Sequence, residues 1–304
     1  MTSLRYTTHL GLLGMAALWG ASWPWGRVVA LSMPPLAAAC VRFALASLVL
    51  VLWLFGSGRM ATLRAIRGPQ WRGLACASAC GVLGYSIFFL LALQRVPAGK
   101  ATLVVALNPV LTLLCAAWLF REPLNWRTVG GLLLAVAGAL WALTGGSLNA
   151  LRPGTAGSGE VLLLGCAGCW VAYTLVGRVV LTTLDALTTS TVTAVMGAVL
   201  LLGASWVAEG PAAWITLAHA PKVAWCSLLA LALGATALAY AWYLRGVKVL
   251  GAGAAAAYMA LVPLFGMLFS GLWLDEPLTP SLLLGGAMAM GGMVCMQWRG
   301  SVRR

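Results

Sequence analysis

The chain has 304 residues, of which 62% are apolar and 8% are charged, and its formal net charge is +13. Soluble domains carry about 25% charged residues, so this composition excludes a water-soluble globular fold. The sequence predicts an integral membrane protein surrounded by a lipid bilayer. Basic residues between membrane spans account for the net charge, so no nucleic-acid partner is expected.

Charge-free segments recur along the chain, each close to the roughly 20 residues that a helix needs to cross a bilayer. Nine such segments contain no charged residue, and a tenth, 34–54, is broken only by Arg42. Alternating strand patterns are absent, and a helix is then the structure that can span lipid. The sequence predicts an all-α polytopic membrane protein with ten transmembrane helices. The nine charge-free segments are 6–26, 73–94, 101–120, 128–151, 161–177, 186–208, 223–244, 249–274 and 277–298.

The first span contains a proline near its end. Pro24 lacks a backbone N–H donor, which frees a carbonyl one turn earlier, near Gly20. Freed carbonyls at membrane depth persist where protein or a watery cavity satisfies them. We therefore predict that Trp19 and Ser22 face a substrate path. The alternative, an interfacial belt of aromatic residues, suits Trp23 better than the deeper Trp19.

The second span contains an ionisable residue, Arg42. At 1.5 Å per residue it lies roughly 12 Å along the helix from Pro34. Ionisable residues inside spans usually face the bundle interior or a polar cavity, which predicts a functional role. The alternative is that the long side chain reaches back to the interface. No acidic partner for Arg42 is evident at mid-span depth.

Three later spans add polar and aromatic candidates. The third carries Tyr85, the fourth carries Asn108 beside Pro109, and the ninth carries Tyr258 before Pro263. Amide and aromatic groups beside helix breaks would suit an amphipathic ligand with a polar head. The alternative is that the prolines bend helices for packing alone.

An internal repeat organises these spans. Pro109 and Pro263 are 154 residues apart, and Trp19 and Trp170 are 151 residues apart. The repeat predicts two five-helix halves, at 8–145 and 160–298, joined by a linker loop at 146–159. Because five is an odd number, the second half enters the membrane in the opposite sense, as in many secondary transporters. The same 154-residue offset pairs Glu122-Pro123 with Glu276-Pro277, Gly131 with Gly285, and Gly138 with Gly292.

The basic residues predict the orientation. If the N-terminus is cytoplasmic, thirteen Lys and Arg residues lie inside, and five lie outside: Arg27, Arg95, Lys100, Arg152 and Lys222. An excess of basic residues marks cytoplasmic loops. Both termini are therefore expected in the cytoplasm.

Several classes of chemistry are disfavoured. The cysteine pair Cys166 and Cys169 has redox spacing, but it lies in an apolar span without a second pair. No metal site, cofactor site or catalytic cluster is predicted.

Glu122 and Glu276 precede prolines and are interpreted as helix stops rather than proton carriers. Because no acidic residue is placed at mid-span to carry protons, we expect the solute to cross by facilitated diffusion or by exchange. The Gly-rich fifth and tenth spans are interpreted as scaffold or dimer contacts.

These features together resemble the EamA-type branch of the drug/metabolite transporter superfamily. The resemblance rests on Trp19-Gly20, Arg42 and the duplicated Pro and Glu-Pro motifs, and it covers about residues 8 to 298. It implies an inner-membrane carrier of small metabolites, often amino acids and often outward. It also implies that Trp19, Ser22, Asn108, Pro109, Tyr258 and Pro263 lie along helices that line a central cavity. The second half has no Arg matching Arg42, and Val262 stands where Asn108 does.

The predicted function is secondary transport of a small neutral or zwitterionic metabolite, with amino-acid export favoured. Efflux of drug-like or cationic compounds is an alternative, but cation carriers usually place a carboxylate in the pathway. A nucleotide-sugar carrier is another, although Arg42 is the only basic group placed for it. A membrane enzyme or a receptor without transport is disfavoured, because no cluster of His, Asp or Glu is present. Either a monomer or a homodimer fits the sequence.

Overall fold

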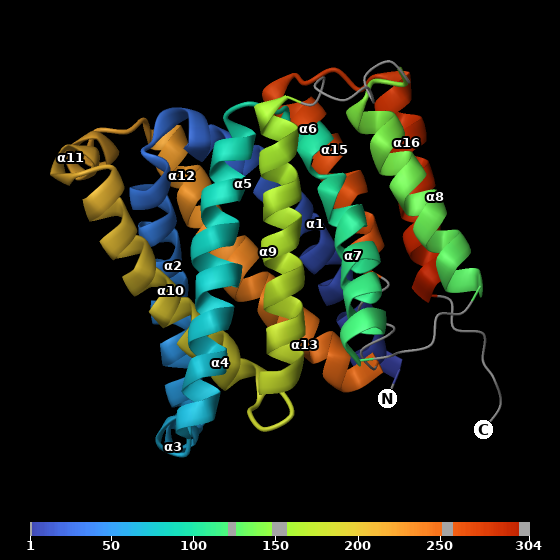
Figure 1. Cartoon of the computed structure of the whole chain (residues 1–304). Coiled ribbons are helices and arrows are strands. Elements are labelled where there is room, and N and C mark those ends of the chain that lie inside the picture. The colour runs from blue at the N-terminus through green and yellow to red at the C-terminus, as the bar shows by residue number, and fades with distance from the viewer. Residues whose placement is uncertain (1, 121–125, 148–156, 251–257, 298–304) are drawn as a thin grey trace, which may run out of the picture. The chain divides into compact units, whose positions relative to one another are not determined.

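The computed structural model describes residues 2–120, 126–147, 157–250 and 258–297, and every regular element in these ranges is a helix (Figure 1). In the first half these are α1 (Thr2–Ser32), α2 (Pro35–Gly56), α3 (Met60–Arg64), α4 (Gly68–Ser78), η1 (Ala79–Gly84), α5 (Tyr85–Leu93), α6 (Ala98–Ala101), α7 (Val104–Phe120) and α8 (Trp126–Leu143). The second half contains α9 (Ser158–Val180), α10 (Ala186–Ala208), α11 (Pro211–Ala218), α12 (Lys222–Leu229), η3 (Ala230–Leu238), α13 (Ala239–Leu250), η4 (Tyr258–Leu261), α15 (Val262–Leu274) and α16 (Pro280–Gln297). The segments η1 and η3 are π-helices, and η4 is a 3-10 helix.

Several of these helices are long and apolar enough to cross a membrane. Large apolar side chains point outward from them, such as Leu52, Val207 and Leu272, which are 60%, 90% and 65% exposed. Water would penalise such surfaces, whereas lipid favours them. The described helices therefore support the predicted all-α polytopic architecture. Five described spans meet the length and composition criteria: Pro35–Gly56, Gly68–Leu93, Ser158–Val180, Ala186–Ala208 and Lys222–Tyr243. Shorter apolar helices lie at Val129–Leu143, Tyr258–Leu274 and Pro280–Cys295.

The chain forms two compact units, and each unit combines segments from both sequence halves. We describe each unit by itself. The first unit contains Met1–Pro24, Val96–Val161 and Ala239–Arg304. The second unit contains Trp25–Arg95 and Leu162–Leu238.

In the first unit, α8 and α16 lie side by side and antiparallel (Figure 1). A Cβ added to Gly138 would lie 2.5 Å from the carbonyl oxygen of Gly285 and 2.5 Å from the amide nitrogen of Ala289. A Cβ on Gly292 would likewise collide with the backbone of Gly131. The two helices therefore touch backbone to backbone, as small residues allow. This glycine face packs within the chain.

Proline is accommodated differently at the three predicted helix breaks. Helix α1 continues through Pro24, and α7 continues through Pro109. Pro263 stands in the first turn of α15, directly after the 3-10 helix η4, where its missing N–H has no intrahelical partner to lose. In the fourth predicted span the helical assignment is interrupted at residues 102–103, between α6 and α7, rather than at the proline.

Two glutamates cap helices that lie far away in the sequence. In the first unit, the carboxylate of Glu276 accepts hydrogen bonds from the N–H groups of Ala98 and Gly99, at 2.7 and 2.8 Å. In the second unit, Glu209 accepts from the N–H groups of Leu36 and Ala37, at 2.7 and 2.9 Å. The first N–H groups of a helix lack intrahelical acceptors, and the helix dipole favours a negative charge there.

This capping extends the interpretation of Glu276 as a helix stop. Helix α15 ends at Leu274, directly before the Asp275-Glu276-Pro277 motif. A residue that precedes proline disfavours helical geometry, which favours a helix end at this motif. The carboxylate then stabilises the start of α6. The corresponding Glu122-Pro123 lies outside the described residues.

Candidate functional site

Arg42 projects from the first half of α2, within the second unit. Its Nη2 donates a hydrogen bond to the hydroxyl of Thr236 at 3.3 Å. Its guanidinium carbon lies 5.2 Å from the ring centroid of Phe43 and 5.9 Å from that of Phe89. A guanidinium within about 6 Å of an aromatic ring is attracted by the ring quadrupole. Protein groups therefore hold this charge at a defined place inside an apolar span.

Thr236 lies in the π-helix η3. Its hydroxyl donates to the carbonyl of Leu231, five residues earlier, at 2.9 Å, and accepts from Arg42. The wider turn of a π-helix leaves backbone groups misaligned with the α-helical pattern, and such segments are frequent at functional sites. The other π-helix, η1, directly precedes Tyr85. Both predicted site residues of the second unit are thus adjacent to, or bonded to, a π-helix.

Tyr85 joins Arg42 to a row of aromatic rings. Its ring stacks on Phe89 at 5.7 Å between centroids and lies 5.8 Å from Trp170 of α9. Trp170 in turn lies 5.9 Å from Tyr173. We call Arg42, Thr236, Phe89, Tyr85 and Trp170 the arginine–aromatic cluster. It combines one cation with apolar ring faces and two hydroxyl groups.

A second aromatic group lies in the first unit. The ring of Trp19 meets Tyr240 edge to face at 5.5 Å and lies 5.6 Å from Tyr243. Tyr258 packs against the same core, and its hydroxyl is 2.7 Å from Nδ1 of His9. The shared core consists of Leu12, Met15, Ala16, Ala239 and Val262.

The two remaining predicted site residues differ in their polar contacts. The hydroxyl of Ser22 donates to the carbonyl of Trp19 at 2.6 Å, so it bonds within its own helix. Asn108 is 7% exposed, and among the described residues its side-chain oxygen has no hydrogen-bond donor. A buried amide oxygen without a donor is unfavourable in a purely structural role. Asn108 is therefore a candidate for contact with a polar ligand.

The structure sorts the six predicted site residues into two groups. Trp19 and Tyr258 pack against one core in the first unit, which also contains Ser22 and Asn108. Arg42 and Tyr85 both contact Phe89 in the second unit. Trp23, for which the sequence left an interfacial belt as the alternative interpretation, is 2% exposed and is buried by protein.

Three residues that contact the predicted site residues were not themselves predicted as site residues: Thr236, Trp170 and Tyr240. The internal repeat contained a signal for two of them. Thr236 stands 151 residues after Tyr85, and Trp170 stands 151 residues after Trp19. Aligning the halves position by position would have nominated both as partners of the predicted site.

Metal-ligating side chains do not gather in the described part of the chain. Within those ranges there is no group of three or more His, Cys, Asp or Glu side chains that could hold an ion. The eight cysteines are free, and Cys166 is buried.

Comparison with known proteins identifies the family. The model of the EamA-like transporter family matches residues 7–144 and 157–298. The chain is 25% identical to the uncharacterized transporter YyaM of Bacillus subtilis strain 168, over 94% of this chain and 92% of that protein. It is 28% identical to a probable terminal-alkyne amino-acid exporter of Streptantibioticus cattleyicolor, over 79% of this chain and 78% of that protein.

Two further matches cover nearly the whole chain. A probable amino-acid metabolite efflux pump of Escherichia coli strain K12 is 26% identical, over 95% of each protein. One crystal structure shares the fold, with a TM-score of 0.66 and 20% identity over 94% of this chain and 96% of that chain. With the membrane-spanning helices described above, these matches show that the chain is a multi-pass membrane protein of the EamA-like transporter family, within the drug/metabolite transporter superfamily.

Proposed function

We propose that the protein exports a small zwitterionic or neutral metabolite, with an amino acid as the favoured substrate. The family implies a small-molecule substrate and a lipid environment. Two relatives are named for the export of amino acids or their metabolites. These names support the substrate class proposed for this chain.

The observation that carries the proposal is the placement of charge. Arg42 offers a guanidinium inside an apolar span, held by Thr236 and two aromatic rings. Every described acidic residue stands at a helix end: Glu160, Asp185, Glu209, Asp275 and Glu276. A cationic substrate would find no carboxylate at mid-span among the described residues, whereas a substrate carboxylate would be attracted to Arg42. Ring faces beside it would pack an apolar side chain.

Transport is proposed to use ten helices as two inverted five-helix repeats. The substrate would enter a central cavity between the repeats and would cross by alternating access. Asn108 would bind the polar head of the substrate, while Trp19 and Tyr258 would contact its apolar part. Because the described acids lie at helix ends, we propose facilitated diffusion or exchange. The flux would follow the solute gradient.

The location proposed is the inner membrane, with both termini in the cytoplasm. The excess of Lys and Arg in alternate connections supports this orientation. We propose that the protein functions as a monomer or as a homodimer. The glycine face of α8 and α16 packs within the chain, so a dimer would use another surface.

Counterflow in proteoliposomes tests the substrate class. Purified protein would be reconstituted and supplied with amino acids, sugars, nucleotide sugars and quaternary amines. We expect exchange of one or more amino acids and none of quaternary amines. Arg42→Gln should raise KM for the amino acid at least about tenfold, because a hydrogen bond to a charged group contributes about 1.5–3 kcal/mol, and Arg42→Lys should restore part of the affinity. Arg95→Gln, which removes an exposed arginine just after α5, should leave KM unchanged. Transport of quaternary amines that survives Arg42→Gln would overturn the proposal.

A further inference from the structure

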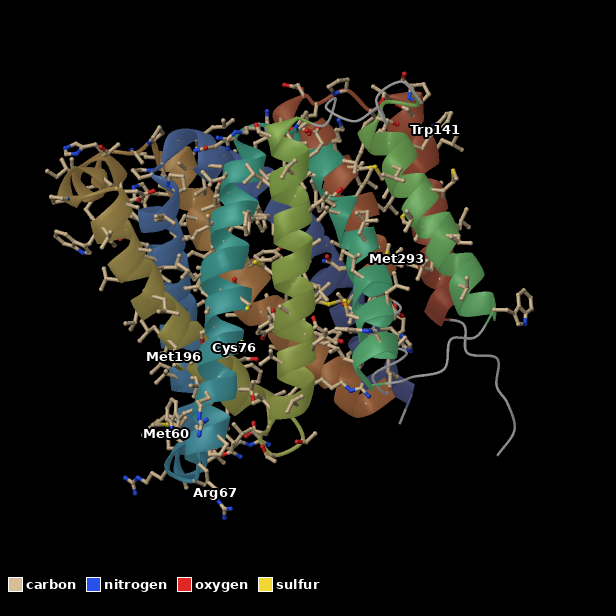
Figure 2. All side chains as sticks on the ribbon, in the orientation of Figure 1. Met60, Arg67, Cys76, Trp141, Met196 and Met293 are labelled. Carbon is tan, nitrogen blue, oxygen red and sulfur yellow. The ribbon has the colours of Figure 1, made fainter. Side chains whose placement is uncertain are left out.

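The connection between α2 and α4 contains an unusual density of positive charge. Residues 55–75 include four arginines and no acidic residue. This connection joins two candidate membrane spans, so it lies where the chain leaves the hydrocarbon region. Figure 2 shows Arg67 pointing away from the helices at this end of the second unit. The four arginines, Arg59, Arg64, Arg67 and Arg72, are all exposed.

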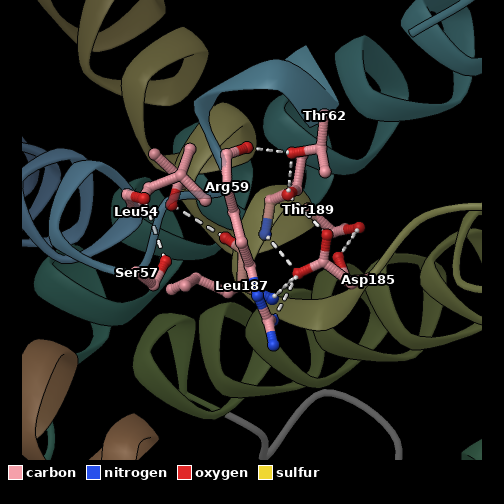
Figure 3. A network of polar contacts seen from close by, with 9 residues as sticks. Leu54, Ser57, Arg59, Thr62, Asp185, Leu187 and Thr189 are labelled. Carbon is pink, nitrogen blue, oxygen red and sulfur yellow. Dashed lines mark hydrogen bonds and ion pairs between the residues drawn. The ribbon is translucent and has the colours of Figure 1, made fainter. Parts of the chain in front are cut away.

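One of the four arginines is engaged within the protein. Nη1 of Arg59 lies 3.5 Å from the carboxylate of Asp185, the residue that caps α10 (Figure 3). Within the described ranges, Arg64, Arg67 and Arg72 form no such ion pair. Their charges therefore remain available at the surface of the protein.

The backbone that carries these arginines is held in place. The hydroxyl of Thr62 is 2.8 Å from that of Thr188, and Nε2 of Gln70 donates to the hydroxyl of Thr183 at 2.9 Å. Ile66 is buried in a core with Leu74, Val180 and Val192. Several contacts therefore join α3 and the start of α4 to the α9–α10 connection. A ligand would meet an ordered surface and would not have to order it first.

Apolar side chains accompany the charges. Phe55, Met60 and Trp71 are 70%, 38% and 42% exposed, and Figure 2 shows Met60 at the same end as Arg67. Tryptophan favours the level of lipid headgroups, where its ring is half in an apolar environment. A surface with both basic and apolar groups at the edge of a span fits a headgroup with its acyl chains. A free inorganic anion fits this surface less well, because it has no acyl chains to contact the apolar groups.

We propose that Arg64, Arg67 and Arg72, together with Trp71, form a binding site for the phosphate groups of anionic phospholipids. We call this site the arginine patch. The planar guanidinium donates two parallel hydrogen bonds to phosphate oxygens, which gives arginine an advantage over lysine in geometry but not in charge. A basic residue near an anionic membrane contributes about fivefold in affinity, so three arginines contribute about a hundredfold.

Lipid retention by the full-length protein tests the site. The protein would be purified in mild detergent and titrated with phosphatidylglycerol or phosphatidylcholine at equal mole fractions. Native mass spectrometry would count the lipids that stay bound. We expect preferential binding of phosphatidylglycerol that weakens with added salt. The variant R64Q/R67Q/R72Q should bind phosphatidylglycerol about a hundredfold more weakly.

Two control variants separate the site from general charge effects. R95Q/K222Q/R245Q removes three positive charges elsewhere and should retain the preference. R64K/R67K/R72K keeps the charge and should retain most of the affinity. Equal loss in the patch variant and the R95Q/K222Q/R245Q variant would overturn the proposal, because net charge would then explain the binding. Unchanged binding by R64Q/R67Q/R72Q would also overturn it. Neither readout depends on the transported substrate.

Discussion

The hydroxyl of Thr236 accepts a hydrogen bond from Arg42 at 3.3 Å, although the two residues are 194 positions apart in the sequence. The same hydroxyl donates to the carbonyl of Leu231, and this bond fixes its orientation. Because the donor role is already occupied, the hydroxyl presents its lone pairs to the guanidinium. Thr236 is therefore a positioning residue for Arg42, and the π-helix η3 determines where it stands.

Replacing Thr236 by valine removes the hydroxyl and keeps the shape of the side chain. A hydrogen bond to a charged group contributes about 1.5–3 kcal/mol, so KM for an amino-acid substrate should rise at least about tenfold. The maximal rate should change less, because Arg42 itself remains. Thr236→Ser retains the hydroxyl and should keep KM near the wild-type value. Counterflow with both variants measures the difference, and equal KM values for the valine and serine variants would refute the positioning role.

The buried amide of Asn108 separates function from stability. Asn108→Leu removes a buried acceptor that has no donor among the described residues, so the thermal midpoint should stay level or rise. Transport should fall by about five- to 150-fold, since the substrate would lose a buried hydrogen-bond partner worth about 1–3 kcal/mol. Trp19→Ala should also weaken transport sharply.

Alanine at two cysteines provides the control for Asn108 and Trp19. Cys166 and Cys169 lie in α9 and are free, so Cys166→Ala and Cys169→Ala should be nearly silent in the same assay. Normal transport by both Asn108→Leu and Trp19→Ala would show that other residues bind the substrate.

Two glycines of α8 should respond oppositely to alanine. At Gly138, an added Cβ would lie 2.5 Å from backbone atoms of α16, which cannot rotate away. Gly138→Ala should therefore cost about 1–3 kcal/mol and should lower the thermal midpoint in detergent. At Gly130 nothing lies within 4 Å of the added Cβ, so Gly130→Ala should be neutral or stabilising, because alanine favours a helix. A similar midpoint for the two variants would contradict the close helix crossing.

The cap of α10 should make stability depend on pH. Burial alone would raise the pKa of Asp185, but hydrogen bonds from the hydroxyl and N–H of Thr188, the charge of Arg59 and the N–H of Leu187 together lower it. A carboxyl group with a lowered folded-state pKa contributes stability that is complete above the unfolded value, about 4, and is lost as pH falls through the folded value.

The comparison with Asp185→Asn measures this contribution. At pH 7 the wild-type protein should melt at a higher temperature than the variant, because the ionised carboxylate accepts charge-assisted hydrogen bonds. The gap in melting temperature should close as pH falls below about 4. A gap that stays constant over this range would mean that ionisation of Asp185 does not contribute.

The orientation is tested by fusing reporters after Arg304. A reporter that is active only in the cytoplasm should work, since the distribution of Lys and Arg predicts a cytoplasmic C-terminus. A second reporter that is active only outside should fail at this position and should work in the connection that contains Arg152. Activity of the external reporter after Arg304 would invert the proposed topology.

The sequence by itself determined the class of the protein. In lipid, backbone groups must bond within their own segment, so runs of about 20 apolar residues become helices wherever they occur. This requirement is local, and it explains why the spans around Arg42 and Asn108 could be located before any contact was known. The close crossing of Gly138 was also foreseeable, because glycine rows on a membrane helix favour backbone contact.

Only the tertiary structure decided which groups meet. The contacts of Arg42 with Thr236, and of Glu276 with the start of α6, join segments 194 and 178 residues apart. Hydropathy and helix length do not predict such pairs, because apolar helices can pack in many arrangements that bury similar areas of apolar surface. Specific polar bonds and ring contacts select one packing among them. For that reason the sequence placed Glu276 at the end of a helix, whereas the structure showed which other helix it caps.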